Sequence, residues 1–288
     1  MRDMREKALC LMQGAYDLHT HNAPSHFKRA TDAFSVLREA DKYGMSGVLL
    51  KSHYECSADV AYLTNMYAGT KAKAYGSLTL NWPVGGINPY AVEAAVKKNI
   101  RYIWMPTLDA ENSMSFGRLP IDFFERPGIS VFDENGDLKK SVYEVMEVVR
   151  KHGAYLATGH LRADEAVAVC KAGRKMGVNM IMTHPDWNRT VVPIDQQIEA
   201  AMCGVLIEKV WYNVEEGNIT AKKMAESIRQ IGPDNVFMVT DRGQPGHKLP
   251  PESLMDFIEC MLEEGISEAE IRVMVHNNPQ KIVEKGLH

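Results

Sequence analysis

Two histidines at the end of a short apolar run are the residues of this sequence best spaced for chemistry. The run begins at Tyr16 and contains Asp17, His19 and His21. Side chains alternate between the two faces of a strand, so His19 and His21 point to the same side. Two imidazoles placed in this way can bind one divalent ion. The spacing therefore indicates a metal site where a strand ends.

Further nitrogen and oxygen ligands end later apolar runs, namely His160, His184 and Asp241. Each alone has an ordinary structural explanation, as a hydrogen-bonded histidine or a helix-capping aspartate. Their joint appearance at strand ends favours one shared site. Imidazoles with a carboxylate suit Zn(II), our first choice, and also Mn(II), Fe(II) or Ni(II), in a centre of one or two ions.

The second run ends with Lys51 and His53, which the same alternation places on one face with Leu49. A buried lysine needs a partner. The structural alternative is that Lys51 pairs with a carboxylate and that His53 is a hydrogen-bonded residue at the rim.

Eight apolar runs, each followed by a helical pattern, must position these side chains. The predicted strands cover residues 15–21, 47–53, 74–81, 102–107, 154–160, 179–185, 205–211 and 236–241. Regular alternation of strand and helix indicates a parallel sheet. Eight units without a linker, in 288 residues, favour a single (β/α)8 TIM barrel domain over residues 1–288. The open doubly wound sheet is the alternative, although no glycine-rich dinucleotide motif follows the first strand.

Helices are predicted between these strands from apolar periodicity and capping residues. Phe34, Leu37 and Ala40 recur at helical spacing, and Asn88 before Pro89 is a helix start. Further helices are predicted over residues 142–152, 164–176, 194–202, 221–231 and 251–263.

A long loop, residues 108–139, follows the fourth strand and contains Asn135-Gly136, a pair that favours a hairpin turn. We expect a flap over one end of the barrel, with Arg118, Phe123 and Phe124 lining a lid. An alternative role for this loop is contact between copies of the chain in a homo-oligomer.

The histidine pattern resembles the amidohydrolase superfamily of (β/α)8 metal-dependent hydrolases. The family's ligands match, in order, His19 and His21, His160, His184 and Asp241. The tail from His276 to Val283 is similar to the family's closing helix.

The fourth strand departs from this pattern, since residues 102–107 offer neither the lysine nor the glutamate that often bridges two ions. Lys51 could replace it as a carbamate, which requires a neutral amine and is therefore favoured by burial. His53 is the other candidate, because it resembles a strand-two histidine of the PHP phosphatase family. Glu208, in the seventh strand, is expected to be a structural ion-pair residue.

The resemblance implies hydrolysis of an amide, lactone or related bond by metal-activated water, with Asp241 as proton acceptor and also a ligand. Arg162, Arg189 and Arg242 follow strand ends closely and predict a small anionic substrate. The alternative for these arginines is pairing with surface carboxylates. Trp82, in the loop after the third strand, is a further candidate for substrate contact.

Three other functions stay open at this stage. One is phosphoester hydrolysis, and the second is metal-dependent decarboxylation or deamination. The third is a non-catalytic barrel that binds a metal or ligand. A structural zinc, however, normally has a closed shell of four protein ligands.

Composition and charge limit the kinds of partner that this protein is expected to have. The net charge of -4, without a basic stripe, argues against nucleic acid. No apolar stretch approaches the roughly 18 residues of a membrane span, and no signal peptide is visible, so we expect a cytoplasmic protein. The five cysteines, widely and irregularly spaced, indicate neither a disulfide framework nor a cysteine metal site.

Overall fold

The computed structural model describes residues 4–117 and 125–284, whose strands form two parallel sheets. One sheet has the order β1 (Tyr16–Thr20), β2 (Gly47–Leu50), β3 (Lys73–Tyr75). The other has the order β4 (Ser77–Thr79), β5 (Tyr102–Trp104), β6 (Tyr155–Ala157), β7 (Asn179–Met182), β8 (Leu206–Val210), β9 (Val236–Val239). The predicted α/β class with parallel strands is confirmed.

The chain groups into two compact units, each of which takes in separate stretches of sequence. The first unit holds residues up to Lys51, residues 57–76 and residues from Glu208 onward. The second unit holds residues 52–56 and 77–207. Strands β1, β2, β3 and β9 belong to the first unit, β4 to β7 belong to the second, and β8 passes from the second into the first.

The predicted third strand, residues 74–81, is divided in the structure. Gly76 separates β3 from β4, and these two strands belong to different sheets. A glycine inside a strand has no side chain to pack and weakens the strand there. The described residues therefore show strands in two sheets and no single closed one, so closure into an eight-stranded barrel stays a prediction.

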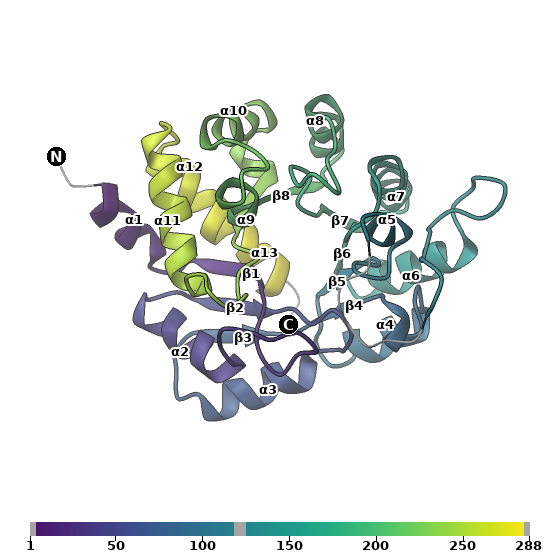
Figure 1. The fold of residues 1–288 in the computed structure, drawn as a ribbon, viewed down its shortest axis with the longest axis horizontal. Coiled ribbons are helices and arrows are strands. Elements are labelled where there is room, and N and C mark those ends of the chain that lie inside the picture. The colour runs from purple at the N-terminus through teal and green to yellow at the C-terminus, as the bar shows by residue number, and fades with distance from the viewer. Residues whose placement is uncertain (1–3, 118–124, 285–288) are drawn as a thin grey trace. The chain divides into compact units, whose positions relative to one another are not determined.

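The helices of the first unit include the predicted one between β1 and β2. They are α1 (Met4–Met12), α2 (Ala33–Lys42), α3 (Ala58–Tyr67), α9 (Trp211–Glu215), α10 (Ala221–Ile231), α11 (Pro250–Glu263), α12 (Glu268–Arg272) and α13 (Asn278–Glu284). Asp32 caps α2 by accepting the backbone N–H of Ser35 at 2.8 Å. Helices α2 and α3 lie along β2 and β3, and α1 packs against α11 from the far end of the sequence (Figure 1).

The second unit contains α4 (Pro89–Val96), α5 (Glu111–Ser115), α6 (Lys140–Lys151), α7 (Ala163–Lys175) and α8 (Ile194–Met202). The predicted cap of α4 is confirmed, because the Asn88 side chain accepts the N–H groups of Tyr90 and Ala91 at 3.0 and 3.4 Å. The other predicted helices appear within two residues of their expected bounds at each end.

A helix was predicted after the second strand without bounds, and the surface of α3 explains why its bounds were hard to define. Tyr62, Leu63, Met66 and Tyr67 are all exposed, so apolar residues cover more than the buried side of the helix. An apolar pattern on both sides hides the period that marks an amphipathic helix.

The long loop after β5 contains the predicted turn. Phe132 and Leu138 form an isolated antiparallel bridge, and the Asp133 N–H donates to the Asp137 carbonyl at 2.8 Å. Gly136 in this turn has φ +83, a conformation that favours glycine. The predicted lid residues Arg118, Phe123 and Phe124 lie outside the described residues.

Strands β2, β5 and β9 are buried at every position. Burial on both faces explains their continuous apolar sequences. Among the helices of residues 4–117 and 125–284, none combines the length and the apolar character needed to cross a membrane.

Candidate metal centre

In the first unit, one carboxylate oxygen lies between two imidazoles. His19 Nε2 is 3.1 Å from Asp241 Oδ1, and His21 Nε2 is 3.0 Å from the same oxygen. The side chains of His19 and His21 are 0% and 3% exposed, and that of Asp241 is 18% exposed. One ligand atom of each residue lies within 4.8 Å of the other two, a spacing compatible with one metal ion.

The backbones of two neighbouring segments place these ligands. His19 lies in β1, His21 follows its end, and Asp241 follows β9. The Asp241 N–H donates to the His19 carbonyl at 2.8 Å, and the His21 N–H donates to the Arg242 carbonyl at 2.8 Å. Asp241 has φ +55, which is uncommon for a residue other than glycine. The two backbone hydrogen bonds hold it in this conformation.

Asp17 links the strand that carries His19 to the segment that carries Asp241. Its carboxyl group accepts the hydroxyl of Thr240 at 2.5 Å, the N–H of Thr240 at 3.1 Å and the N–H of His19 at 3.2 Å. Burial raises the pKa of Asp17 to about 7. These hydrogen bonds go to His19 itself and to Thr240, which precedes Asp241, so Asp17 is a positioning residue.

Glu208 orients the first histidine. Its Oε1 lies 3.1 Å from His19 Nδ1, and both side chains have no exposed surface. The carboxylate accepts the Nδ1 proton, so Nε2, which faces Asp241, is the nitrogen that can give up its proton to bind a metal ion. Burial acts to lower the pKa of His19, but the charges of Asp241 and Glu208 raise it to about 9. This pairing of carboxylate and histidine is a regular feature of metal sites, so the residues present fit a divalent ion.

Lys51 lies at the same site. Its Nζ is 2.7 Å from His19 Nε2, and the residue is 3% exposed. Burial lowers the pKa of Lys51 to about 8, while Asp241 and Glu208 oppose this shift. The lysine thus places a cationic group against the nitrogen that a metal ion would use, which is a further sign that the site suits a cation. The role of Lys51 as a ligand or carbamate stays a prediction.

His53 belongs to the second unit, and the strand on which the predicted shared face with Lys51 depends is shorter than expected, so that shared face stays a prediction. Strand β2 ends at Leu50, and the alternation of a strand does not extend beyond it. In the second unit, the ring centroid of His53 is 6.0 Å from that of His160, which is 5.0 Å from that of His184.

These three histidines share one kind of hydrogen bond. Each Nδ1 lies 2.9 to 3.0 Å from a hydroxyl oxygen, in the pairs His53 with Thr107, His160 with Ser113 and His184 with Thr190. The Thr190 hydroxyl donates to the His184 carbonyl at 3.0 Å, so it accepts from His184 Nδ1. The lone pair of His184 is therefore on Nε2. Their role as ligands with His19 and His21 stays a prediction.

Two of the predicted substrate-binding arginines already have acidic partners. Arg162 contacts Asp164 at 2.6 and 2.8 Å on the surface. Arg242 is fully buried and pairs with Glu215 and Glu216. Pairing of this kind is the alternative that the sequence left open for the arginines.

The other two predicted contact residues lie in the second unit. The Arg189 guanidinium is 5.2 Å from the Trp187 ring centroid and 5.4 Å from that of Phe116. Trp82 donates its indole N–H to the Pro127 carbonyl at 2.8 Å and is 38% exposed. Substrate binding by either residue stays a prediction.

Arg29 was not predicted, and it lies beside the candidate metal ligands. Its Nη2 is 3.2 Å from His21 Nδ1. Burial and the charge of Arg29 lower the pKa of His21 to about 3. A signal existed, because the loop that follows the first strand of a barrel belongs to the end that carries active sites.

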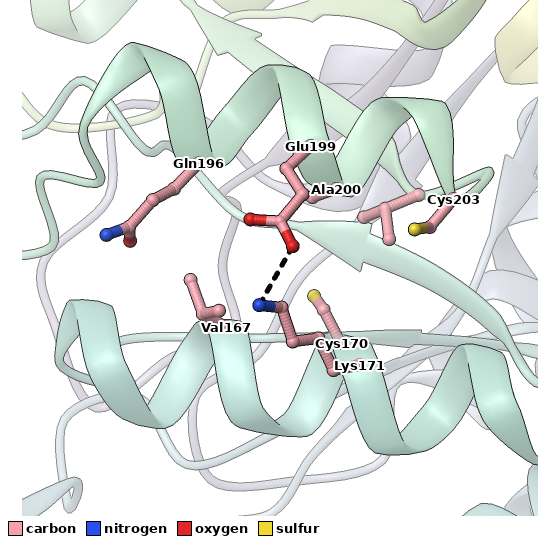
Figure 2. Close-up of a pocket in the computed structure, with 8 residues that line it drawn as sticks. Val167, Cys170, Lys171, Gln196, Glu199, Ala200 and Cys203 are labelled. Carbon is pink, nitrogen blue, oxygen red and sulfur yellow. Dashed lines mark ion pairs between the residues drawn. The ribbon is translucent and has the colours of Figure 1, made fainter.

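A surface pocket lies elsewhere in the second unit, between α7 and α8 (Figure 2). The ion pair of Lys171 and Glu199, at 2.9 Å, spans it. Burial raises the pKa of Cys170, on its inner wall, to about 12, so this thiol is not a nucleophile at neutral pH. The enclosed volume of about 20 Å³ holds about one water molecule, so we do not assign it to a substrate.

Solved structures share this fold over nearly the whole chain. An amidohydrolase from Pseudomonas aeruginosa has a TM-score of 0.65 and 11% identity, covering 98% of this chain and 98% of its own. A dipeptidase described as a metallopeptidase has a TM-score of 0.61 and 13% identity, covering 95% of this chain and 98% of its own. A 2,6-dihydroxybenzoate decarboxylase from Rhizobium has a TM-score of 0.55 and 13% identity, covering 94% of this chain and 99% of its own. The chain shares the fold of these enzymes, which include an amidohydrolase, as the sequence resemblance predicted.

The match to a sequence family covers a shorter part of the chain than the match to solved structures does. The chain belongs to DUF6282, a family of unknown function, whose model matches residues 14–208. The matched range includes His19, His21, Lys51 and Glu208, whereas Asp241 lies beyond it. Among curated proteins, none matches the sequence.

Proposed function

We propose that this protein is a metal-dependent hydrolase of the amidohydrolase type. It binds a divalent ion, with zinc as first choice, through His19, His21 and Asp241, and it hydrolyses an amide, lactone or related bond of a small anionic substrate. The observation that carries this proposal is the convergence of two Nε2 atoms on Asp241 Oδ1, at 3.1 and 3.0 Å. The superfamily fold supports it.

A bound divalent ion lowers the pKa of water to near 7 and polarises a carbonyl oxygen. The chain supplies the rest of the chemistry. Glu208 holds a proton on Nδ1 of His19, so Nε2 is the nitrogen that would bind the ion. Burial alone would raise the pKa of Asp241, but its contacts with His19 and His21 hold it well below its usual range. Asp241 is therefore ionised at neutral pH and accepts the proton of the attacking water, which it returns to the leaving group.

The proposal keeps the other predicted ligands as candidates. His160 and His184 follow the superfamily's order along the chain, and Lys51 or His53 would complete a second ion site. Metal content of the His160→Asn and His184→Asn proteins tests the first pair. Each variant is expected to bind less metal per chain than the unmodified protein.

The central experiment measures metal and turnover together. Zinc, manganese, iron or nickel is added to metal-free protein, and metal per chain is determined after desalting. Unmodified protein should retain metal, whereas the double variant His19→Asn, His21→Asn should lose both metal and turnover. The control His152→Asn changes a histidine whose ring contacts the Val148 carbonyl at 3.0 Å on α6, and it should retain both. Full metal retention by the double variant would overturn the proposal.

The substrate panel separates the chemical alternatives. Lactones and N-acyl amino acids test attack on a carbonyl, and p-nitrophenyl phosphate tests phosphoester hydrolysis. Release of carbon dioxide from aromatic hydroxy acids tests decarboxylation, the activity named for one protein with this fold. Metal binding without turnover on any of them would favour a binding protein.

A further inference from the structure

We infer that Arg29 binds the anionic group of the substrate at the His19, His21 and Asp241 site, and that its guanidinium is available for this only when His21 ligates a metal ion. The inference rests on the proposed function. It concerns a residue that the predicted arginines did not include.

Arg29 has an unusual set of contacts for a half-buried cation. Its Nη2 lies 3.2 Å from His21 Nδ1, its Nε lies 3.4 Å from Ser25 Oγ, and its guanidinium is 5.3 Å from the Phe27 ring centroid. Within residues 4–117 and 125–284, no carboxylate forms a salt bridge with it, in contrast to Arg162 and Arg242. Burial lowers the pKa of Arg29, and the charge of Asp241 opposes this shift.

This arrangement suits an anionic ligand. A guanidinium that loses water contacts without gaining a carboxylate carries an electrostatic cost. An incoming carboxylate or phosphate would remove that cost and could accept two parallel N–H bonds from the planar group. Arg29 is thus a cation beside the proposed reaction centre with donors to offer a substrate.

The backbone holds Arg29 in this place. The Ala23 N–H donates to the Thr31 carbonyl at 2.8 Å, which closes the base of the loop. The Ala30 N–H donates to the Gly243 carbonyl at 2.9 Å, which joins the loop to the segment after Asp241. A Cβ on Gly243 would lie 1.8 Å from the His21 carbonyl oxygen, so the close approach of these segments requires glycine.

The dependence on metal follows from two neighbours that the described residues place at His21 Nδ1. One is the Lys51 carbonyl oxygen at 3.3 Å, which can only accept a hydrogen bond, and the other is Arg29 Nη2 at 3.2 Å, which can only donate one. When Nδ1 accepts from Arg29, a neutral His21 carries its proton on Nε2, toward Asp241. When His21 uses Nε2 as a ligand, its proton lies on Nδ1 and points to the Lys51 carbonyl.

The second state removes the acceptor that holds Arg29. An N–H group on Nδ1 cannot accept from the guanidinium, so Arg29 must find another acceptor. The anionic group of a substrate provides one. Arg29 is therefore held by His21 in the metal-free protein and free to bind substrate in the metal-loaded protein.

The test compares Arg29→Gln with Lys28→Gln, which removes one positive charge from the exposed neighbouring residue of the same loop. Zinc affinity is measured by competition with a chromophoric chelator, and malonate binding by calorimetry. Arg29→Gln should bind zinc at least as tightly as the unmodified protein, because a nearby cation is removed. It should bind malonate about tenfold more weakly in the zinc-loaded state, which corresponds to the loss of one charge-assisted contact. In metal-free protein the change should be smaller.

Lys28→Gln should change neither affinity by more than about twofold, as expected for an exposed charge. Arg29→Lys keeps the charge without the planar fork and should recover part of the malonate affinity. It also serves as the second variant if Arg29→Gln folds poorly. Equal malonate binding by Arg29→Gln and Lys28→Gln, with zinc bound normally, would overturn the role of Arg29. It would leave the proposed function in place. Absence of zinc binding in the unmodified protein would instead overturn the proposed function.

Discussion

Glu208 Oε1 lies 3.1 Å from His19 Nδ1, and these two fully buried residues are 189 positions apart in the sequence. The contact joins β8 to β1 and holds a proton on Nδ1 of His19, so that Nε2 is the nitrogen available to a metal ion. It therefore orients a candidate metal ligand.

Replacing Glu208 by Gln should weaken zinc binding by about 10- to 100-fold, the usual effect of removing a carboxylate behind a ligating histidine. The amide can donate as well as accept, so it no longer fixes the proton on Nδ1. Competition with a chromophoric chelator measures the change. Glu226→Gln, an exposed change on α10, is the control and should bind zinc normally. Unchanged affinity in Glu208→Gln would show that this contact does not orient the ligand.

Replacing Asp241 by Asn should lower turnover by about 10²- to 10⁴-fold, the typical contribution of a general base. Most of the metal should remain bound, because the two histidines stay in place. Asn tolerates the left-handed conformation of this position, φ +55, so the backbone should not change. Turnover and metal content are measured on the same sample. The control Asp234→Asn, at an exposed position, should behave as the unmodified protein, and normal turnover in Asp241→Asn would contradict its role.

Replacing Thr240 by Val should lower the free energy of unfolding by about 1–3 kcal/mol, because the buried Asp17 carboxyl loses its hydroxyl donor. That hydrogen bond measures 2.5 Å. Thr64→Val is a matched control, since the buried Thr64 hydroxyl has no hydrogen-bond partner among the described residues. In urea unfolding, the free energy of unfolding of Thr64→Val should equal that of the unmodified protein or be slightly higher. Equal stability of the two variants would show that the hydrogen bond between Thr240 and Asp17 does not stabilise the contact of β1 with the segment after β9.

Alkaline pH should weaken the fold through Tyr16. Its hydroxyl donates to Glu284 at 2.6 Å. Burial raises the pKa of Tyr16 to about 12, and this hydrogen bond acts in the same direction, whereas tyrosine in an unfolded chain titrates near 10. Because the folded pKa is the higher one, the stabilisation is complete below about pH 10 and is lost as pH rises through 12.

The measurement is Tm between pH 9 and 12. The Tyr16→Phe protein should have the lower Tm at pH 9, and its difference from the unmodified protein should shrink toward pH 12. Tyr90→Phe changes an 80% exposed tyrosine and should follow the unmodified protein throughout. A constant difference between Tyr16→Phe and the unmodified protein would show that this hydroxyl does not titrate in the expected range.

Local features of the sequence predicted much of the fold. Helix α8 (Ile194–Met202) and helix α10 (Ala221–Ile231) have their predicted bounds. The apolar residues of α10 are buried along one side, so periodicity alone reveals that helix. The pattern did not define the bounds of α3, which exposes apolar residues such as Tyr62 and Met66. The division of the third predicted strand at Gly76 also depends on sheet pairing, which periodicity does not contain.

The sequence by itself determined the types of ligand, because His19, His21 and Asp241 could be selected by spacing and by their place at strand ends. The tertiary structure decided which groups act on them. It placed Glu208 behind His19 and Arg29 against His21, and it placed His53 in a different unit from Lys51. The physical reason is that the proton position of a histidine depends on the atoms within hydrogen-bond distance, and the contact with Glu208 arises only when strands distant in sequence fold together.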